Sequence, residues 1–424
     1  MPIDAIAAKL AVLLENLLQT PIPVRLRAWD GSEAGPTGTP ILVVHHRRAL
    51  RRLMWQPNEL GLARAYVSGE IDVEGDLYDA LSRLAALIWR SPEIHGLPIR
   101  AVAGDLIRLR IIGMQPKPPP EEMVVSGTRH SRGRDRQAVS QHYDVGNEFY
   151  RIVLGPSMVY SCAYWTGTGP DYDLADAQRD KLDLICRKLD LRSGQRLLDV
   201  GCGWGSLAMH AAREYGVRVL GITLSSEQAD YARKLVAEAG LSDLVEIRVQ
   251  DYRDLDDGPF DAISSIGMAE HVGTQPYVEY ARILYGQLKP GGRVLNHQIA
   301  AIHPQPKGNG RSFIDAYVFP DGELVPIGTT VSLIEEAGFE VRDVQALREH
   351  YARTLRAWVA NLEADWSRAV RLTSAGRARV WRLYMAASAL AFEHGRIGVN
   401  QVLAVRTHRD GASDMPPTRD GWLA

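Results

Sequence analysis

The chain has 424 residues, 46% of them hydrophobic and 24% charged, and its formal net charge is −2. This length allows two or three domains with sizeable cores, and the near-neutral charge gives no electrostatic reason to expect a nucleic-acid partner. No apolar run approaches the ~18 residues that cross a bilayer, and the first residues lack a signal-peptide pattern. Cys162, Cys186 and Cys202 show no CxxC spacing, so we expect a cytoplasmic protein with neither a disulfide framework nor a metal site.

Residues 1–112 are predicted to form a small α+β accessory domain that interacts with lipid. Within it, residues 3–19 carry apolar side chains at helical spacing, and residues 41–46 are predicted to form a short strand. Two further helices are expected within residues 57–90, around the turn SGEIDVEGD. The amphipathic first helix packs on its own domain, contacts a membrane surface or forms a homodimer, and the sequence leaves these three alternatives open.

The next stretch, residues 113–136, has a run of prolines followed by arginine, glycine and serine. It is predicted to be a linker, because this composition is unsuited to a packed core. Its basic residues are either solvated or in contact with anionic lipid headgroups, at ~1 kcal/mol per residue near the surface. They are Arg129, His130, Arg132, Arg134 and Arg136.

From about residue 190, apolar strand-like runs alternate with helix-like segments, which is typical of a doubly wound, Rossmann-like α/β sheet that is largely parallel. The expected strands are 196–200, 217–222, 245–249, 260–266 and 292–299. Residues 345–396 are predicted to be helical, and 399–405 to form a last strand. We expect this domain to span 137–406 and to be followed by a polar, frayed tail at 407–424.

A glycine-rich turn, LLDVGCGWG, follows the first of these strands. Glycines there allow a tight bend and the close approach of a ligand. Dinucleotide folds use the similar GxGxxG, and a purely structural turn is a further alternative. The acid placed two residues before the first glycine favours S-adenosylmethionine as the ligand. The candidate cofactor-binding residues of this turn are Asp199, Gly201, Gly203, Trp204 and Gly205.

Two later strand ends complete the predicted cofactor site. The second strand ends in GITLSSEQ, without the acid that binds an NAD ribose, so Thr223 and Gln228 are expected to bind ribose hydroxyls instead. The third strand ends at QDYRD, where Asp251 is expected to accept from the adenine amine and Tyr252 to flank the ring. A simple turn or helix cap is the alternative for Asp251.

Further motifs carry a family resemblance. They are QHYDVGNEFY, YSCAYW, SSIGMAEHVG, NHQIA and EHYARTLRAW. Together with the glycine turn and GITLSSEQ, they resemble the cyclopropane-fatty-acyl-phospholipid synthase family, including the mycolic acid methyltransferases and the actinobacterial branch that makes methylene-branched fatty acids. The resemblance covers roughly residues 135–406, and the N-terminal domain is similar to that of longer members. It implies a class I S-adenosylmethionine methyltransferase fold.

The resemblance also implies roles for individual residues. Tyr143, Tyr160 and Ser161 resemble lid and pocket residues, and Gly201 and Gly203 would line the methionine part of the cofactor. The family holds a bicarbonate ion beside the reacting carbon. Its ligands correspond to Cys162, Glu270, His297, the backbone of Ile299, and Tyr351. Ala269 stands where relatives often carry Phe, which implies an altered acyl pocket, and Glu148 is either a supporting acid or a surface residue.

The chemistry can also be argued from the residue types. An alkene is a poor nucleophile, so it needs a strong electrophile such as a sulfonium methyl. Transfer leaves positive charge on carbon, which negative charge and aromatic faces stabilise in a pocket that excludes water. Glu270, Tyr351 and Tyr143 are of the right types. Proton loss from the new methyl closes a cyclopropane, whereas loss elsewhere gives an alkene such as a methylene branch, and the motifs fit both outcomes.

Each of these residues also has an ordinary structural alternative. Cys162 could be a small buried hydrophobe, Glu270 a helix cap, His297 a core histidine and Tyr351 a packing residue. Their joint occurrence favours a site, because Glu270 and His297 both follow or end predicted strands, where ligands bind in such sheets.

The predicted function is therefore methyl or methylene transfer from S-adenosylmethionine to the double bond of an unsaturated phospholipid acyl chain. The enzyme is expected to be cytoplasmic, associated peripherally with a membrane surface, without a nucleic-acid partner, and with a homodimer left open. A small-molecule N-methyltransferase of related architecture is the main alternative. A non-catalytic protein that binds lipid or cofactor is the third hypothesis.

Overall fold

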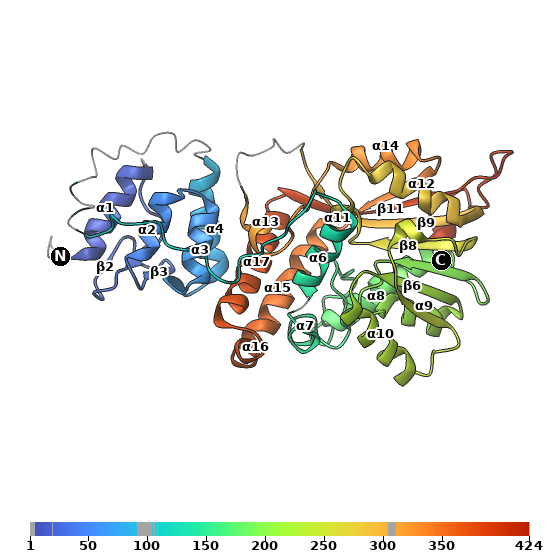
Figure 1. Ribbon diagram of the computed structural model, residues 1–424, viewed down its shortest axis with the longest axis horizontal. Helices are drawn as coiled ribbons and strands as arrows, with labels where there is room; N and C mark the ends of the chain where they lie inside the picture. The colour runs from blue at the N-terminus through green and yellow to red at the C-terminus, as the bar shows by residue number, and fades with distance from the viewer. Residues whose placement is uncertain are drawn as a thin grey trace. The chain divides into compact units, whose positions relative to one another are not determined.

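The computed structural model describes residues 5–18, 20–90, 104, 107, 109–143, 145–303 and 311–423. The chain divides into two compact units (Figure 1). Unit 1 takes the described parts of 1–124, 309–318 and 373–390, and unit 2 takes those of 125–308, 319–372 and 391–424. Two segments from the predicted methyltransferase domain, 309–318 and 373–390, therefore belong to the N-terminal unit.

Unit 1 is an α+β unit with a small sheet whose described strands run in the order β2-β1-β3-β4. Its elements are α1 (Ile6–Leu18), β1 (Arg25–Arg27), β2 (Glu33–Ala34), β3 (Ile41–Val44), α2 (Arg48–Trp55), α3 (Glu59–Val67), β4 (Ile71–Glu74), α4 (Leu77–Arg90), α13 (Phe313–Tyr317) and most of α17 (Ala375–Glu393). The predicted turn around residues 68–76 contains strand β4, and α2 was not predicted.

Helix α1 corresponds to the predicted helix 3–19, of which residues 3, 4 and 19 lie outside the described residues. Ala7, Leu10 and Leu13 on this helix are almost fully buried in a cluster that also contains Val24 and Leu26. The apolar face of the helix therefore packs within its own unit, which is the first of the three alternatives given above.

The predicted linker, 113–136, is not a free tether along its whole length. Met123 is buried, and its backbone N–H donates to the carbonyl of Ala316 at 2.8 Å. Glu122 forms an ion pair with Arg64 at 2.7 Å. The stretch up to residue 124 thus packs into unit 1, because its few apolar and acidic side chains find partners far away in the sequence.

Three of the linker's arginines also have internal partners, all within unit 2. Arg129 and Arg134 both pair with Asp321, and Arg132 pairs with Asp254 at 2.8 Å. Arg132 is also the first residue of α6 (Arg132–Tyr143). These arginines therefore have acidic partners within the chain, and neither interpretation of the stretch anticipated this.

Unit 2 is built on a seven-stranded sheet, counted over the described residues, in the order β10-β11-β9-β8-β5-β6-β7. Its strands are β5 (Arg196–Val200), β6 (Arg218–Thr223), β7 (Val245–Val249), β8 (Phe260–Ile266), β9 (Leu288–Ala301), β10 (Glu340–Ala346) and β11 (Ile397–Val405). All neighbours pair in parallel except β11, which is antiparallel to both β9 and β10. The predicted α/β class and the six predicted strands are confirmed, and β10 was missed.

Helices cover both faces of this sheet (Figure 1). The described helices of unit 2 are α6, α7 (Asn147–Leu154), α8 (Leu174–Lys188), α9 (Ser206–Tyr215), α10 (Ser226–Glu238), the 3-10 helix η1 (Tyr252–Asp254), α11 (Ala269–Val272), α12 (Tyr277–Gln287), α14 (Ile327–Glu336), α15 (Arg348–Ala364), α16 (Trp366–Leu372) and α18 (Asp420–Leu423). Alternation along each strand sends successive residues to opposite faces. Leu197 thus packs with α8 and α9, whereas Leu198 packs with α12 and α14.

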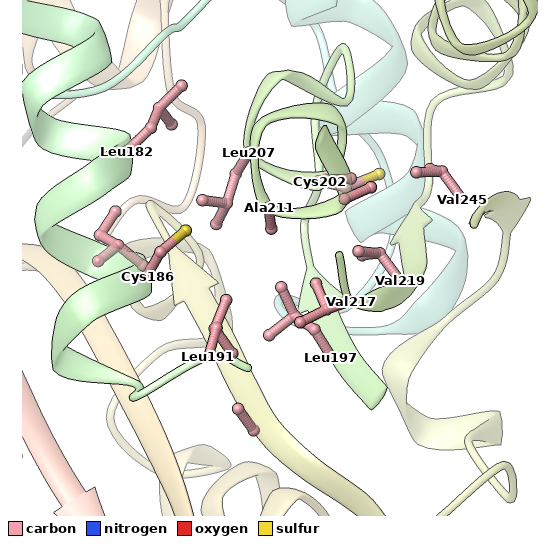
Figure 2. Packing of buried hydrophobic residues seen from close by; sticks show 14 of the residues in the cluster. Leu182, Cys186, Leu191, Leu197, Cys202, Leu207, Ala211, Val217, Val219 and Val245 are labelled. Carbon is pink, nitrogen blue, oxygen red and sulfur yellow. The ribbon is translucent and has the colours of Figure 1, made fainter. Parts of the chain in front are cut away.

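The cluster beneath α8 and α9 explains two of the three cysteines. Cys186 and Cys202 lie among Leu182, Leu207 and other apolar side chains (Figure 2). Burial raises the pKa of both thiols, so they remain neutral and pack as small hydrophobes.

The predicted frayed tail is wrong for the described part of 407–424. Arg419 forms an ion pair with the buried carboxylate of Asp343, and Arg342 donates to Ser413 at 3.2 Å. Met415 packs against the core. The tail is polar, yet Arg419 meets a buried partner and Met415 packs on the core, so its described part is attached to the domain.

Candidate active site

The glycine turn connects β5 to α9 at the carboxyl edge of the sheet. Gly201 has φ of +76°, and a Cβ there would collide with the side chain of Met268. Gly205 has φ of +80°, and a Cβ there would lie 3.2 Å from the Cβ of Ala232 on α10. Gly201 therefore needs glycine at the cavity wall, whereas Gly205 needs it for helix packing.

A cavity opens at these strand ends, entirely within unit 2. Most of the predicted cofactor residues line it, and Tyr143 joins them. The predicted residues that line it are Tyr143, Tyr160, Ser161, Asp199, Gly201, Gly203, Trp204, Thr223, Gln228 and Tyr252. Gly205 and Asp251 are not among the lining residues.

At the end of β6, two neutral polar side chains meet. The Oγ1 of Thr223 donates to the Oε1 of Gln228 at 3.0 Å, and both residues are buried. Gln250, at the end of β7, also lines the cavity and was not predicted. This end of the cavity thus offers hydroxyl and amide groups, which suit the hydroxyls of a ribose.

Asp251 is placed differently from its prediction. It caps η1, and its carboxylate accepts from Arg253 Nε at 2.8 Å and Nη2 at 2.7 Å. Burial raises the pKa of Asp251, but the hydrogen bonds from Arg253 outweigh it, so the net pKa is lowered. The capping alternative describes the local structure, and adenine binding by this residue stays a prediction.

Two buried ionisable groups flank the glycine turn. Asp199 accepts from the hydroxyl of Ser264 at 2.7 Å, and burial raises its pKa to about 6. Lys181 on α8 donates to the Oγ of Ser161 at 3.0 Å, and burial lowers its pKa to about 8. Sequence reasoning missed Lys181, although helical spacing places it on the same face as Ile185, which is an apolar position.

Aromatic rings form another wall of the cavity. Trp204 lies 4.7 Å from Tyr150 and 5.6 Å from Tyr143, measured between ring centroids. Tyr160 lies 5.8 Å from Tyr150 and 5.7 Å from His142. Such a set of π faces stabilises positive charge by cation–π attraction.

The predicted reacting residues other than Tyr143 do not line this cavity, although Met268 and His271, on either side of Glu270 in the chain, do. The Oε1 of Glu270 accepts from the backbone N–H of Ile299 at 2.7 Å, and its Oε2 is buried with no hydrogen-bond partner among the described residues. Burial raises the pKa of Glu270 to about 7. The structure thus brings Glu270 and Ile299 together.

His297 is on the same strand as Ile299. Its Nδ1 lies 3.3 Å from the Nε2 of Gln401, and its Nε2 is buried with no partner in the part of the chain that the structure describes. Burial, with a smaller contribution from Lys181, lowers the pKa of His297 to about 3, so the ring is neutral at physiological pH. Buried polar atoms are normally satisfied, so these two open atoms on Glu270 and His297 indicate a place for a ligand.

Cys162 and Tyr351 meet at the carbonyl of Leu347. The Sγ of Cys162 lies 3.7 Å from this oxygen, and the backbone N–H of Tyr351 donates to it at 3.2 Å. Burial raises the pKa of the Cys162 thiol, which keeps it neutral. Tyr351 and Tyr160 both pack on the buried ring of Trp358, so the aromatic wall continues to this group.

Other predictions have simpler outcomes. Glu148 is exposed and forms an ion pair with Arg368 at 2.7 Å, which is the surface alternative. His271 lines the cavity, and burial, with a smaller contribution from His130, lowers its pKa to about 4. Its neighbour Ala269 is buried.

Comparison with known proteins decides the family. Residues 130–402 match the family described as mycolic acid cyclopropane synthetase. The chain belongs to this family. It is an S-adenosylmethionine-dependent methyltransferase of the cyclopropane-synthase type, with the class I fold that the sequence predicted.

Individual relatives of this cyclopropane synthetase family extend the match. A probable fatty acid methyltransferase of Pseudomonas putida is 41% identical over 417 residues, covering 97% of this chain and 99% of that protein. The cyclopropane-fatty-acyl-phospholipid synthase of Escherichia coli K12 is 39% identical over 271 residues, covering 64% and 68%. The structure of mycolic acid cyclopropane synthase CmaA1 complexed with SAH and CTAB is 36% identical, has a TM-score of 0.59, and covers 63% of this chain and 97% of that one.

Proposed function

We propose that this protein methylates the double bond of an unsaturated phospholipid acyl chain at a membrane surface, giving a cyclopropane or a methylene-branched product. One observation carries the proposal. Two ionisable side chains, Glu270 and His297, are buried with open polar atoms beside an aromatic-walled cavity that contains the glycine turn.

The cofactor has a fitting place in the cavity. We propose that Gly201 and Gly203 contact the methionine part of S-adenosylmethionine, that Thr223 and Gln228 hold the ribose, and that Tyr252 flanks the adenine. When bound, S-adenosylmethionine supplies an electrophilic methyl group on a sulfonium.

The chain's own residues then stabilise the charge that methyl transfer leaves on the acyl carbon. The rings of Tyr143, Tyr160 and Trp204 present π faces, and their bulk excludes water that would trap a cation. Glu270 contributes negative charge in its ionised form from a position of low dielectric.

The product requires a proton to leave. Glu270 has a pKa near neutrality, so its open oxygen can accept a proton. The Nδ1 of the neutral His297 ring accepts from the amide of Gln401, so its open Nε2 carries the ring hydrogen and can donate a hydrogen bond. We propose that these atoms, with the groups of Cys162, Ile299 and Tyr351, hold a bicarbonate ion. Such an ion supplies a further proton acceptor when bound.

The membrane association is proposed to be peripheral, in a cytoplasmic enzyme. In the part of the chain that the structure describes, every helix is too short or too polar to traverse a bilayer. The acyl chain must then reach the cavity from the surface of the bilayer.

The decisive experiment supplies methyl-labelled S-adenosylmethionine with either dioleoylphosphatidylglycerol vesicles or a panel of soluble amines. Label in the lipid, with the mass of one CH₂ group added per chain, supports the proposal. Hydrogenation of the product then separates a ring from a methylene branch. Label found only in amines refutes it.

A matched pair of variants tests the role of the buried acid. Glu270→Gln is expected to abolish turnover while leaving cofactor binding intact, whereas Glu148→Gln removes an exposed carboxylate and should keep activity. Turnover that survives in the first variant contradicts the role proposed for Glu270.

A further inference from the structure

Lys181 on α8 is a buried cation on the wall of the cofactor cavity. The residue is 1% exposed and lines the cavity beside Ser161 and Asp199. An ammonium group carries three donor hydrogens. Among the described residues, the Nζ of Lys181 has one hydrogen bond, to the Oγ of Ser161 at 3.0 Å, and no carboxylate within ion-pair distance.

The same helix offers a comparison two turns further on. Lys188 is equally buried at 1% exposed, but its Nζ lies 3.5 Å from the carboxylate of Asp343 and donates to the Oε1 of Gln345 at 2.6 Å. A buried charge is costly unless a partner of opposite charge compensates it. Lys188 has its partner within the chain, whereas Lys181 has two donor hydrogens left for a ligand.

The cavity indicates which ligand group fits. Lys181 interacts electrostatically with Asp199, which ends the strand before the glycine turn, whereas the neutral Thr223 and Gln228 at the end of another strand bond to each other. The neutral pair suits the ribose. The amino-acid end of S-adenosylmethionine carries a carboxylate, which is the only anionic group of that molecule.

We propose that the ammonium of Lys181 binds the carboxylate of the methionine part of S-adenosylmethionine. Lys181 is then a cofactor-binding residue that selects for the amino-acid end of the ligand. Gln178, one turn earlier on α8, donates to the carbonyl of Ser161 at 3.0 Å, so the helix holds this wall of the subsite by two side chains.

A purely structural Lys181 would only hold Ser161 in place. The two roles differ in what they do to a ligand that lacks the carboxylate. We therefore compare S-adenosylhomocysteine with its decarboxylated analogue, and titrate both by calorimetry into the full-length protein. Neither ligand requires an acyl acceptor, so this test is independent of the lipid substrate.

The expected pattern is a loss of selectivity. The unmodified protein should bind S-adenosylhomocysteine at least about 10-fold more tightly than the analogue, as a charge-assisted contact implies. Lys181→Met should remove this preference by weakening only the carboxylate-bearing ligand, and binding of the analogue reports that the cavity is folded. Lys188→Met is the matched control, and it should keep the preference.

Two results would overturn the proposal. The first is equal affinity of the unmodified protein for both ligands. This measurement needs no variant, so it is informative even if Lys181→Met does not fold. The other is a Lys181→Met protein that keeps the preference or weakens both ligands by the same factor. Lys181→Gln provides a second, polar replacement for the same comparison.

Discussion

The buried carboxylate of Glu270 predicts a pH-dependent stability that can be isolated with one substitution. Burial raises its pKa from the ordinary 4.5 to about 7. The folded protein therefore favours the protonated acid, and this contribution is present below pH 4.5 and lost as the pH rises through about 7. A pKa difference of this size between the unfolded and the folded protein corresponds to about 3 kcal/mol in the free energy of unfolding. Glu270→Gln has no charge to bury, so its free energy of unfolding should not show this loss.

The assay is urea unfolding of both proteins in CO₂-free buffer between pH 5 and pH 8.5. We expect the variant's stability relative to the unmodified protein to rise by about 3 kcal/mol across this range. The change with pH is the informative quantity, because any constant cost of an unpartnered amide cancels from it. Glu148→Gln is the control, and its exposed ion pair is worth at most about 1 kcal/mol. A difference that stays constant with pH, or that falls, would refute the reasoning.

Three further predictions concern other parts of the chain. Gly201→Ala should weaken cofactor binding, because an alanine is strained at φ of +76° and its Cβ would displace the side chain of Met268 on the cavity wall; a titration curve that matches the unmodified protein would contradict this. Cys162→Ser should lower turnover while shifting the melting temperature by less than about 5 °C, since the hydroxyl keeps the local hydrogen bond; a larger shift favours a packing role. Leu10→Ala should destabilise unit 1 by about 2–5 kcal/mol in urea unfolding, whereas the same change at the exposed Val12 should be nearly neutral.

At the glycine turn, the structure agrees with the prediction from the sequence. The strand ending at Val200, the turn and the helix that follows could be predicted, because strand alternation and glycine spacing are local properties of the chain. The glycine turn and the strand ends after it supplied seven candidate residues and the family resemblance three more, Tyr143, Tyr160 and Ser161, and all ten line one cavity. The order of amino acids was sufficient for the fold class and for many of the residues that line this cavity.

Contacts between distant residues were decided only by the tertiary structure. The bond from Ile299 N–H to Glu270 joins residues 29 apart, and the lone hydrogen bond of Lys181 depends on how α8 lies against the segment of Ser161. The partner of Arg134, Asp321, is 187 residues away in the sequence. The local sequence could not show this ion pair, so the basic stretch was expected either to be solvated or to contact lipid headgroups. Local patterns specify which face of an element is apolar, but burial, pairing and hence pKa depend on where separate elements come together in three dimensions.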